Sequence, residues 1–212
     1  MDLPKGKKHV GCKWVFTLKY KADGTLEKYK ARLVAKGFTQ VYGEDYTETF
    51  TPVAKLNTIR ILLSIAVNLD WDRHQLDVKN DFLNGELKEE VYMKLPLGFP
   101  GKKANQVYKL KRSLYGLKQS PRAWFERFTR VLKRHGYTQG QSDHTLFFKH
   151  HKGKMVVLAV YVDDIVLTGD DKVEINQIKG ALTREFQVKD LEEMKYFLGM
   201  EVARSKGKIY IS

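Results

Sequence analysis

The sequence predicts an α+β fold in which an antiparallel sheet is covered by helices on one face. First, several pairs of alternating segments are joined by short turns, which is typical of β-hairpins. Second, three stretches carry apolar residues at helical spacing and lie irregularly between the strands. Third, 42% of the 212 residues are hydrophobic, which suffices for the core of one domain, or of one domain with a small satellite.

The first half of the chain predicts a hairpin, a helix and short strands. Residues 13–21 and 26–36 alternate and are separated by Asp23-Gly24, a dipeptide that favours the positive φ of a hairpin turn. Apolar residues recur at helical spacing over about 55–69, which predicts an amphipathic helix. Further strands are expected at 74–78, 91–93 and 106–110.

The second half predicts two helices and a series of strands. Ser120-Pro121 indicates a helix start, because a hydroxyl N-cap is followed by proline at the first helical position. This helix is expected to stop at Gly136. The remaining expected elements are strands at 145–149, 154–162 and 165–167, a helix through Ile175, Ile178 and Leu182, and closing strands at about 195–203 and 208–211.

The positive charge is concentrated in two blocks. The formal net charge is +13, of which residues 1–36 carry +7 and residues 94–134 carry +11, whereas residues 37–93 carry −5. Aromatic residues are interleaved with the second basic block: Tyr108, Tyr115, Trp124, Phe125 and Phe128. Basic residues can follow a phosphate backbone and aromatic rings can stack on bases, so a nucleic-acid partner is expected. The alternative is a solvated basic helix whose aromatic residues belong to the core.

Cysteine content and hydropathy exclude several classes of protein. With Cys12 as the single cysteine, an internal disulfide framework and a multi-cysteine zinc site are excluded. The longest unbroken apolar run, residues 155–162, is too short to span a bilayer, and the N-terminus does not have the pattern of a signal peptide. We therefore expect a soluble protein of a reducing compartment that has no membrane partner.

Acidic residues beside apolar strands need an explanation. Asp163-Asp164 lies between apolar runs, where carboxylates are costly unless they are solvated, paired or metal-bound. Asp77 ends a short strand in the same manner. If neighbouring strands bring these carboxylates together, they form an oxygen-ligand cluster suited to Mg²⁺, and a pair of such ions supports phosphoryl transfer. A plain β-turn with aspartates at its turn positions is the alternative.

Ordered motifs reveal a family resemblance. Tyr161-Val162-Asp163-Asp164 resembles the YxDD signature of reverse transcriptases, and the wider sequence resembles the polymerase of copia-type LTR retrotransposons. The supporting runs, in family order, are 30–38 (KARLVAKGF), 49–54 (TFTPVA), 75–80 (QLDVKN), 113–122 (SLYGLKQSPR) and 196–199 (YFLG). A lone YxDD tetrad would be a weak signal, whereas ordered motifs over nearly the whole chain are specific.

The resemblance implies a right-hand polymerase whose palm is a ferredoxin-like antiparallel sheet. Residues 10–75 and 90–120 would be mostly fingers, and residues 76–89 and 121–212 mostly palm. The family's first strand and upstream helix, its thumb, and the RNase H and integrase segments are expected to lie outside this chain. The chain would then be a fragment of a longer Pol polyprotein, with the other Pol domains as partners, in a cytoplasmic virus-like particle or in the nucleus.

The resemblance also implies RNA-directed DNA polymerase activity, a nucleotidyl transfer that uses a pair of Mg²⁺ ions. Asp77 and Asp163 would bind both ions, Asp164 would be the third catalytic carboxylate, and the backbone carbonyl of Val78 would be a further ligand. The substrates would be deoxynucleoside triphosphates and an RNA or DNA template with a primer. Because base pairing supplies sequence choice, the protein would contact backbone shape and stacked bases rather than base edges.

Further residues are implied to bind the nucleotide and the primer. Lys30 and Arg32 would neutralise the triphosphate, and the backbone amides from Asn80 to Phe82 would hold it. Phe82 would lie under the sugar and exclude a 2′-hydroxyl, Tyr115 and Gly116 would floor the nucleotide pocket, and Phe197, Leu198 and Gly199 would support the primer terminus. The alternatives are a solvated hairpin face for the two cations, a core position for Phe82, and ordinary strand packing for 197–199.

Asp81 departs from the family pattern, which has a small residue, usually alanine, at this position. A carboxylate beside amides that hold a triphosphate would repel it, so weakened nucleotide binding is expected. A catalytically impaired nucleic-acid-binding relic of a retrotransposon polymerase is therefore the alternative function. Another two-metal palm enzyme, such as a nucleotidyl cyclase, is disfavoured by Tyr161 and by the Ser120-Pro121 helix block.

Overall fold

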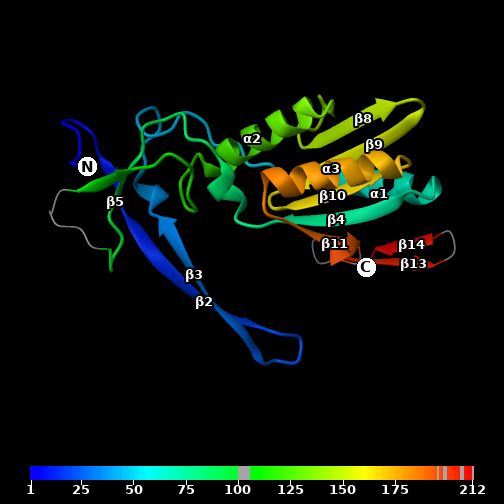
Figure 1. Cartoon of the computed structure of the whole chain (residues 1–212), viewed down its shortest axis with the longest axis horizontal. Coiled ribbons are helices and arrows are strands. Elements are labelled where there is room, and N and C mark those ends of the chain that lie inside the picture. Colours follow the sequence, from blue (N-terminus) through cyan, green and yellow to red (C-terminus); the bar gives the residue numbers. More distant parts are fainter. Residues whose placement is uncertain (100–105, 195, 198–199, 206–207, 212) are drawn as a thin grey trace. The chain divides into compact units, whose positions relative to one another are not determined.

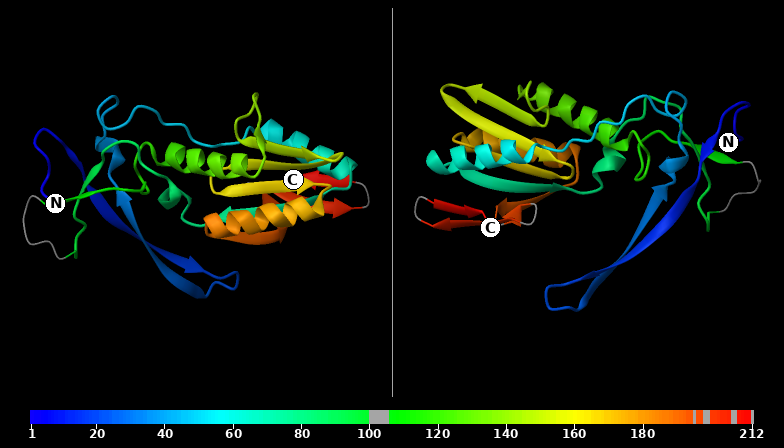
Figure 2. Two further views of the ribbon diagram at one scale, coloured as in Figure 1. Left: turned by 45° about the horizontal axis from the view of Figure 1, so that its top comes forward. Right: turned by 180° about the vertical axis from the view of Figure 1, so that it is seen from behind.

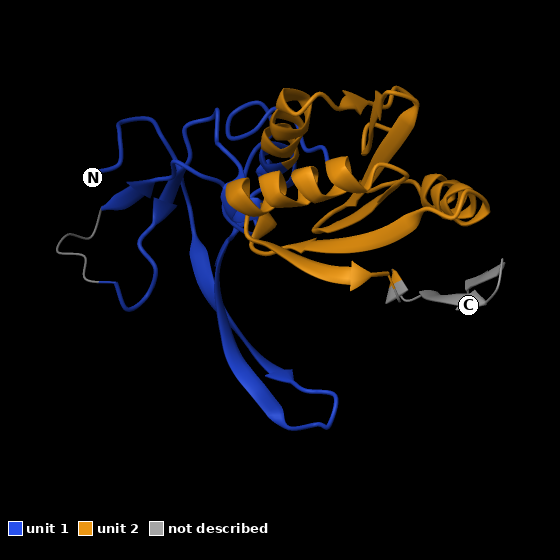
Figure 3. Cartoon of the chain, turned by 45° about the vertical axis from the view of Figure 1, so that its right-hand side comes forward, with its two compact units in different colours: residues 1–50, 82–124 blue, residues 51–81, 125–212 orange. Residues whose placement is uncertain are grey.

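The computed structural model describes residues 1–99, 106–194, 196–197, 200–205 and 208–211. The chain divides into two compact units (Figure 3): unit 1 is residues 1–50 and 82–124, and unit 2 is residues 51–81 and 125–212. These bounds differ from the predicted fingers and palm ranges at 51–75, 82–89 and 121–124. No helix in the described part of the chain has both the length and the apolar character needed to cross a membrane.

Unit 1 contains a small sheet and a long two-stranded ribbon. The sheet has the order β1 (His9–Val10), β5 (Tyr92–Lys94), β6 (Val107–Lys109). The ribbon pairs β2 (Cys12–Tyr20) with β3 (Leu26–Ala35), as the alternating segments predicted (Figure 1). At its tip Gly24 has φ +81°, and the backbone N–H of Thr25 donates to the Asp23 carboxylate at 2.9 Å.

Unit 2 is built on a sheet in which every neighbouring pair is antiparallel. Its order among the described residues is β11-β4-β10-β9-β8-β7. The strands are β4 (Asp72–Val78), β7 (Thr138–Gln139), β8 (Leu146–His151), β9 (Lys154–Tyr161), β10 (Asp164–Gly169) and β11 (Val188–Glu193). β12 (Tyr196–Phe197), β13 (Met200–Ser205) and β14 (Lys208–Ile211) form a second, smaller sheet.

Helices cover both faces of the larger sheet, so the prediction of helices on one face is wrong (Figures 1 and 2). The helices are α1 (Leu56–Asn68), α2 (Ser120–Arg134) and α3 (Lys172–Glu185), and short 3₁₀ turns occur at η1 (Gly37–Thr39) and η2 (Asp81–Asn84). Residues of α1 pack in one cluster with Val157 and Val166. On the opposite face Phe128 of α2 contacts Phe147. The physical reason is that β9 and β10 are buried on both sides, as a continuous apolar run rather than an alternating one requires.

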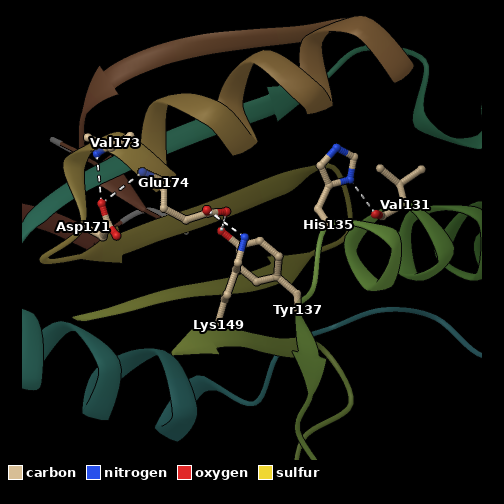
Figure 4. A network of polar contacts seen from close by, with 7 residues as sticks. All are labelled: Val131, His135, Tyr137, Lys149, Asp171, Val173 and Glu174. Carbon is tan, nitrogen blue, oxygen red and sulfur yellow. Dashed lines mark hydrogen bonds and ion pairs between the residues drawn. The ribbon is translucent and has the colours of Figure 1, made fainter. Parts of the chain in front are cut away.

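A polar network fastens α3 to the sheet on the α2 side (Figure 4). Glu174, in the first turn of α3, accepts from Lys149 Nζ at 2.8 Å and from the Tyr137 hydroxyl at 3.1 Å. Asp171 caps the same helix by accepting from the backbone N–H groups of Val173 and Glu174. Burial, with Glu174 nearby, raises the pKa of Tyr137.

Three of the five aromatic residues of the second basic block belong to the core: Trp124, Phe125 and Phe128. For these three, the alternative prediction of core positions is confirmed.

Candidate active site

The strand register brings Asp77 and Asp164 to the same corner of the sheet. In the antiparallel pair of β4 and β10 their Cα atoms are direct partners, so both side chains project from one face, the face that α1 covers elsewhere. The backbone N–H of Val78 donates to the carbonyl of Asp163 at 2.8 Å, which ties the end of β4 to the neighbouring turn. Asp163 is exposed, whereas Asp77 and Asp164 are half-buried. Two of the carboxylates that the motifs singled out, Asp77 and Asp164, are therefore direct neighbours, and Asp163 precedes Asp164 in the turn.

The turn between β9 and β10 is strained. Tyr161 and Asp164 are partners, which leaves Val162 and Asp163 as a two-residue loop. Val162 has φ +57°, a conformation that glycine normally supplies and that is unfavourable for a β-branched side chain. Its N–H donates to the carbonyl of Pro52 at 2.7 Å, and Ala54 donates to the carbonyl of Val160 at 3.1 Å. The segment 52–54 thus fixes the turn in a shape that it would otherwise avoid.

The electrostatics of the corner disfavour negative charge. Burial raises the pKa of Asp164, and the neighbouring carboxylates of Asp163 and Asp77 raise it further. A hydrogen bond from Gln75 Nε2 to Asp164 Oδ1, at 3.0 Å, acts in the opposite direction by stabilising the ionised form. Carboxylates that repel one another in this way are the donor set that a divalent cation would stabilise. Within the described ranges, however, no three His, Cys, Asp or Glu side chains are grouped closely enough to hold a metal ion.

Several residues that were predicted to bind the nucleotide contact one another within unit 1. The ring of Phe82 meets the ring of Tyr115 edge-on, with centroids 5.1 Å apart. The guanidinium of Arg32 lies 5.8 Å from the centre of the Tyr115 ring. Gly116 has φ +89°, and a Cβ there would come within 2.2 Å of the carbonyl oxygen of Ala35, so only glycine fits.

The other residues predicted to bind the nucleotide or the primer are Lys30, Asn80 and residues 197–199. Lys30 lies two residues before Arg32 on β3, so both side chains belong to the same face of the ribbon. Asn80 is exposed in unit 2 with φ +54°. Phe197 is 1% exposed and its ring lies edge-on to Tyr161, which favours the strand-packing alternative for its side chain. Leu198 and Gly199 lie outside the described residues.

Sequence reasoning missed two features of the corner. Gln75 belongs to the predicted 74–78 strand and to the 75–80 motif but has no predicted role, although its spacing of two from Asp77 places both on one face. The positive φ of Val162 carries no sequence signal, because valine is not a residue that predicts a tight turn.

The match to a known family shows the class of protein. Residues 1–212 match the family described as "Reverse transcriptase (RNA-dependent DNA polymerase)", and the chain belongs to that family.

Among curated proteins the chain is similar to plant transposon polyproteins. It is 48% identical over 204 residues to the retrovirus-related Pol polyprotein from transposon RE1 of Arabidopsis thaliana. This alignment covers 96% of this chain and 14% of that protein. It is 46% identical over 209 residues to the corresponding polyprotein from transposon TNT 1-94 of Nicotiana tabacum, covering 97% of this chain and 16% of that protein. The copia-type resemblance is thereby confirmed, and the chain spans about one-seventh of the length of these relatives.

Proposed function

We propose that the chain is the fingers and palm portion of an RNA-directed DNA polymerase that extends a primer by two-metal phosphoryl transfer. One observation carries this proposal: Asp77 and Asp164 are register partners beside Asp163, in a chain of the reverse transcriptase family. The activity would be exercised within a longer Pol polyprotein, in a cytoplasmic particle or in the nucleus.

The strand order supports a ferredoxin-like palm in unit 2. Along the chain β4 leads through α2 to the hairpin of β9 and β10, and then through α3 to β11. In the sheet these four strands have the order β11-β4-β10-β9, as in a β-α-β-β-α-β unit of ferredoxin-like type. We assign unit 2 to the palm and unit 1 to the fingers. This assignment moves residues 51–75 to the palm, because α1 packs on the palm sheet.

In this proposal Asp77, Asp163 and Asp164, with the backbone carbonyl of Val78, hold a pair of Mg²⁺ ions. When bound, such ions make a primer 3′-hydroxyl more acidic and neutralise charge on the leaving pyrophosphate. The protein contributes rigid placement of the carboxylates, because the register of β4 with β10 and the hydrogen bond between Val78 and Asp163 fix the corner. Mg²⁺ often uses only one or two protein carboxylates together with substrate phosphates, so a three-residue cage is not required beforehand.

The incoming nucleotide would use the groups gathered in unit 1. Arg32 Nε is buried and has no hydrogen-bond partner in the described part of the chain, and a phosphate oxygen would satisfy it. Phe82 would select against a 2′-hydroxyl through its position against Tyr115, which with Gly116 would floor the pocket. Lys30 would add a second cation. As the family resemblance implies, the backbone amides from Asn80 to Phe82 would bind the triphosphate.

The β2–β3 ribbon supports a nucleic-acid partner because all the basic side chains of its paired strands lie on one face and the exposed aromatic rings on the other. One face carries Lys13, Lys19, Lys28, Lys30 and Arg32, together with Val15, Thr17 and Val34. The other carries Cys12, Trp14, Phe16, Leu18, Tyr29, Ala31, Leu33 and Ala35. Phe16 and Tyr29 are 76% and 79% exposed, an unusual state for such rings. Cations for phosphates and rings for bases suit a template strand.

A catalytically impaired relic that still binds nucleic acid is the second candidate, and Asp81 favours it. This side chain is 3% exposed and lies in the first turn of η2, next to the amides assigned to the triphosphate. A buried carboxylate at this place would oppose phosphate binding without affecting the ribbon.

Extension of a primed homopolymer template with Mg²⁺ and deoxynucleotides tests the proposal. The chain is compared with its Asp163→Asn variant, which keeps the size of the side chain and removes its charge. Extension by the parent chain that is lost in the variant is expected. Equal signals from both would remove the enzyme, and salt-sensitive binding of primer-template without extension would establish the relic.

A further inference from the structure

The strand register gives the acidic corner two polar neighbours: Lys189 of β11 is the direct partner of Asp77, and Gln75 of β4 lies next to Asp164. Gln75 pairs with Val166 across β4 and β10, two positions along from the pair formed by Asp77 and Asp164. Residues two apart on a strand share a face, so Gln75 is the diagonal neighbour of Asp164, within reach of a long side chain. The contact is made: Nε2 donates to Asp164 Oδ1 at 3.0 Å.

The donor in this contact is a neutral amide, which suits a cation site. Two carboxylates on opposed strands repel one another, and without a restraint their side chains would turn apart toward water. A neutral amide restrains Asp164 without bringing a positive charge that would compete with a bound cation. A lysine or arginine at the same position would form an ion pair and occupy the place of the metal.

We propose that Gln75 is a positioning residue for divalent-cation binding, which it serves by orienting Asp164. The inference rests on the proposed metal site at Asp77, Asp163 and Asp164. The hydrogen bond commits Oδ1 of Asp164 to Gln75 and leaves Oδ2 to serve the cation. Partners of this kind, one bond removed from the metal, typically contribute ten- to hundredfold in metal affinity.

The test measures binding of Mn²⁺ to the full chain by electron paramagnetic resonance of the free ion, with no substrate present. Gln75→Met removes the donor and keeps an unbranched side chain of similar length. We expect its Mn²⁺ dissociation constant to rise about tenfold or more. The matched control is Gln139→Met on β7 of the same sheet, whose Nε2 donates to the carbonyl of His144 at 2.8 Å, and its affinity should equal that of the parent.

A double-mutant cycle separates positioning from a general loss of structure. In an Asp164→Asn background, Gln75→Met should cause no further loss of Mn²⁺ affinity, because Gln75 acts through Asp164. Thermal unfolding of each metal-free variant checks that it is folded, and Gln75→Leu replaces Gln75→Met if the latter is not. Parent-like affinity in the folded Gln75 variant, or equal losses in both backgrounds, overturns the inference while leaving the metal site intact. A parent chain that binds no Mn²⁺, or binds it as well after Asp163→Asn, overturns the metal site and the inference together.

Discussion

Asp164→Asn should make the metal-free protein more stable, although it removes a residue assigned to the active site. The Asp164 side chain is opposed to Asp77 across the strand pair and is half-buried, and both features disfavour its charge. Asparagine keeps the size of the side chain and an oxygen that can accept the hydrogen bond from Gln75. The substitution therefore removes repulsion and desolvation without removing a contact.

The register fixes the size of the effect. Side chains directly opposite in an antiparallel pair have Cβ atoms about 5 Å apart. At that separation two charges repel by about 3 kcal/mol at an effective dielectric of about 20 and by about 0.8 kcal/mol in water. Because the side chains of Asp77 and Asp164 are half-exposed, solvent screening brings the gain toward about 1 kcal/mol. For a chain of this length the melting temperature should then rise by about 2–4 °C.

The assay is thermal unfolding followed by circular dichroism at pH 7.5 with a chelator, repeated as the pH is lowered. Since the pKa of Asp164 is raised in the folded state, the folded protein holds this proton more tightly than the unfolded chain does. The destabilisation is complete above the raised pKa and is relieved as the pH falls through it, so the advantage of the variant should shrink in acid. Millimolar Mg²⁺ should reverse the order, because only the parent keeps the full carboxylate set.

Asp23→Asn is the control, because hydrogen bonds from Thr25 lower the pKa of Asp23 and favour its charge. This substitution should give no stabilisation at neutral pH. An Asp164→Asn protein that melts at or below the parent temperature in chelator would refute the reasoning, since the two carboxylates could not then share the space in which a cation would bind.

Three further predictions concern the turn, the α3 network and η2. Val162→Gly should raise the melting temperature by a few degrees, because glycine relieves about 1–3 kcal/mol of strain at φ +57° and loses about 0.5–1 kcal/mol to chain entropy. Mn²⁺ binding should weaken in the same variant, and an unchanged melting temperature would mean that the turn is not strained. Glu174→Gln should lower the free energy of unfolding in urea by about 1–3 kcal/mol, because Lys149 loses a half-buried partner. The control Glu44→Gln, in an exposed ion pair, should change it little, and equal losses of stability in both variants would count against the network. Asp81→Ala should lower the KM for deoxynucleotides in primer extension, and little improvement would contradict the assigned repulsion.

Most elements could be predicted because local chemistry encodes them. The sequence predicts the Asp23-Gly24 tip, the Ser120 helix start and the helix through Ile175, Ile178 and Leu182. The elements β2, β3, α2 and α3 lie within a few residues of those predictions. The strand β11 was missed because Val188–Glu193 is mostly charged and does not alternate. Its backbone pairing with β4 supplies what the side chains do not, and such pairing is a tertiary property.

The candidate site could be predicted in its residues but not in its geometry. Asp77 and Asp164 stand far apart in the chain, and only the register shows that they are direct partners. A shift of one residue would turn Asp77 to the opposite face, with no change in any motif. The role of Gln75 depends on the same register. The contact of Arg32 with the Tyr115 ring likewise joins two elements that no local pattern connects.

The loss of folding stability at the corner distinguishes a plain turn from a cation site. A turn that only reversed the chain would be more stable with glycine in place of Val162 and without opposed carboxylates. The corner combines both unfavourable features and holds them with hydrogen bonds from outside the loop, at Pro52 and Val78. Substitutions that relieve either feature should therefore stabilise the metal-free protein and weaken cation binding. This opposition between stability and binding is expected of a functional site and not of a structural turn.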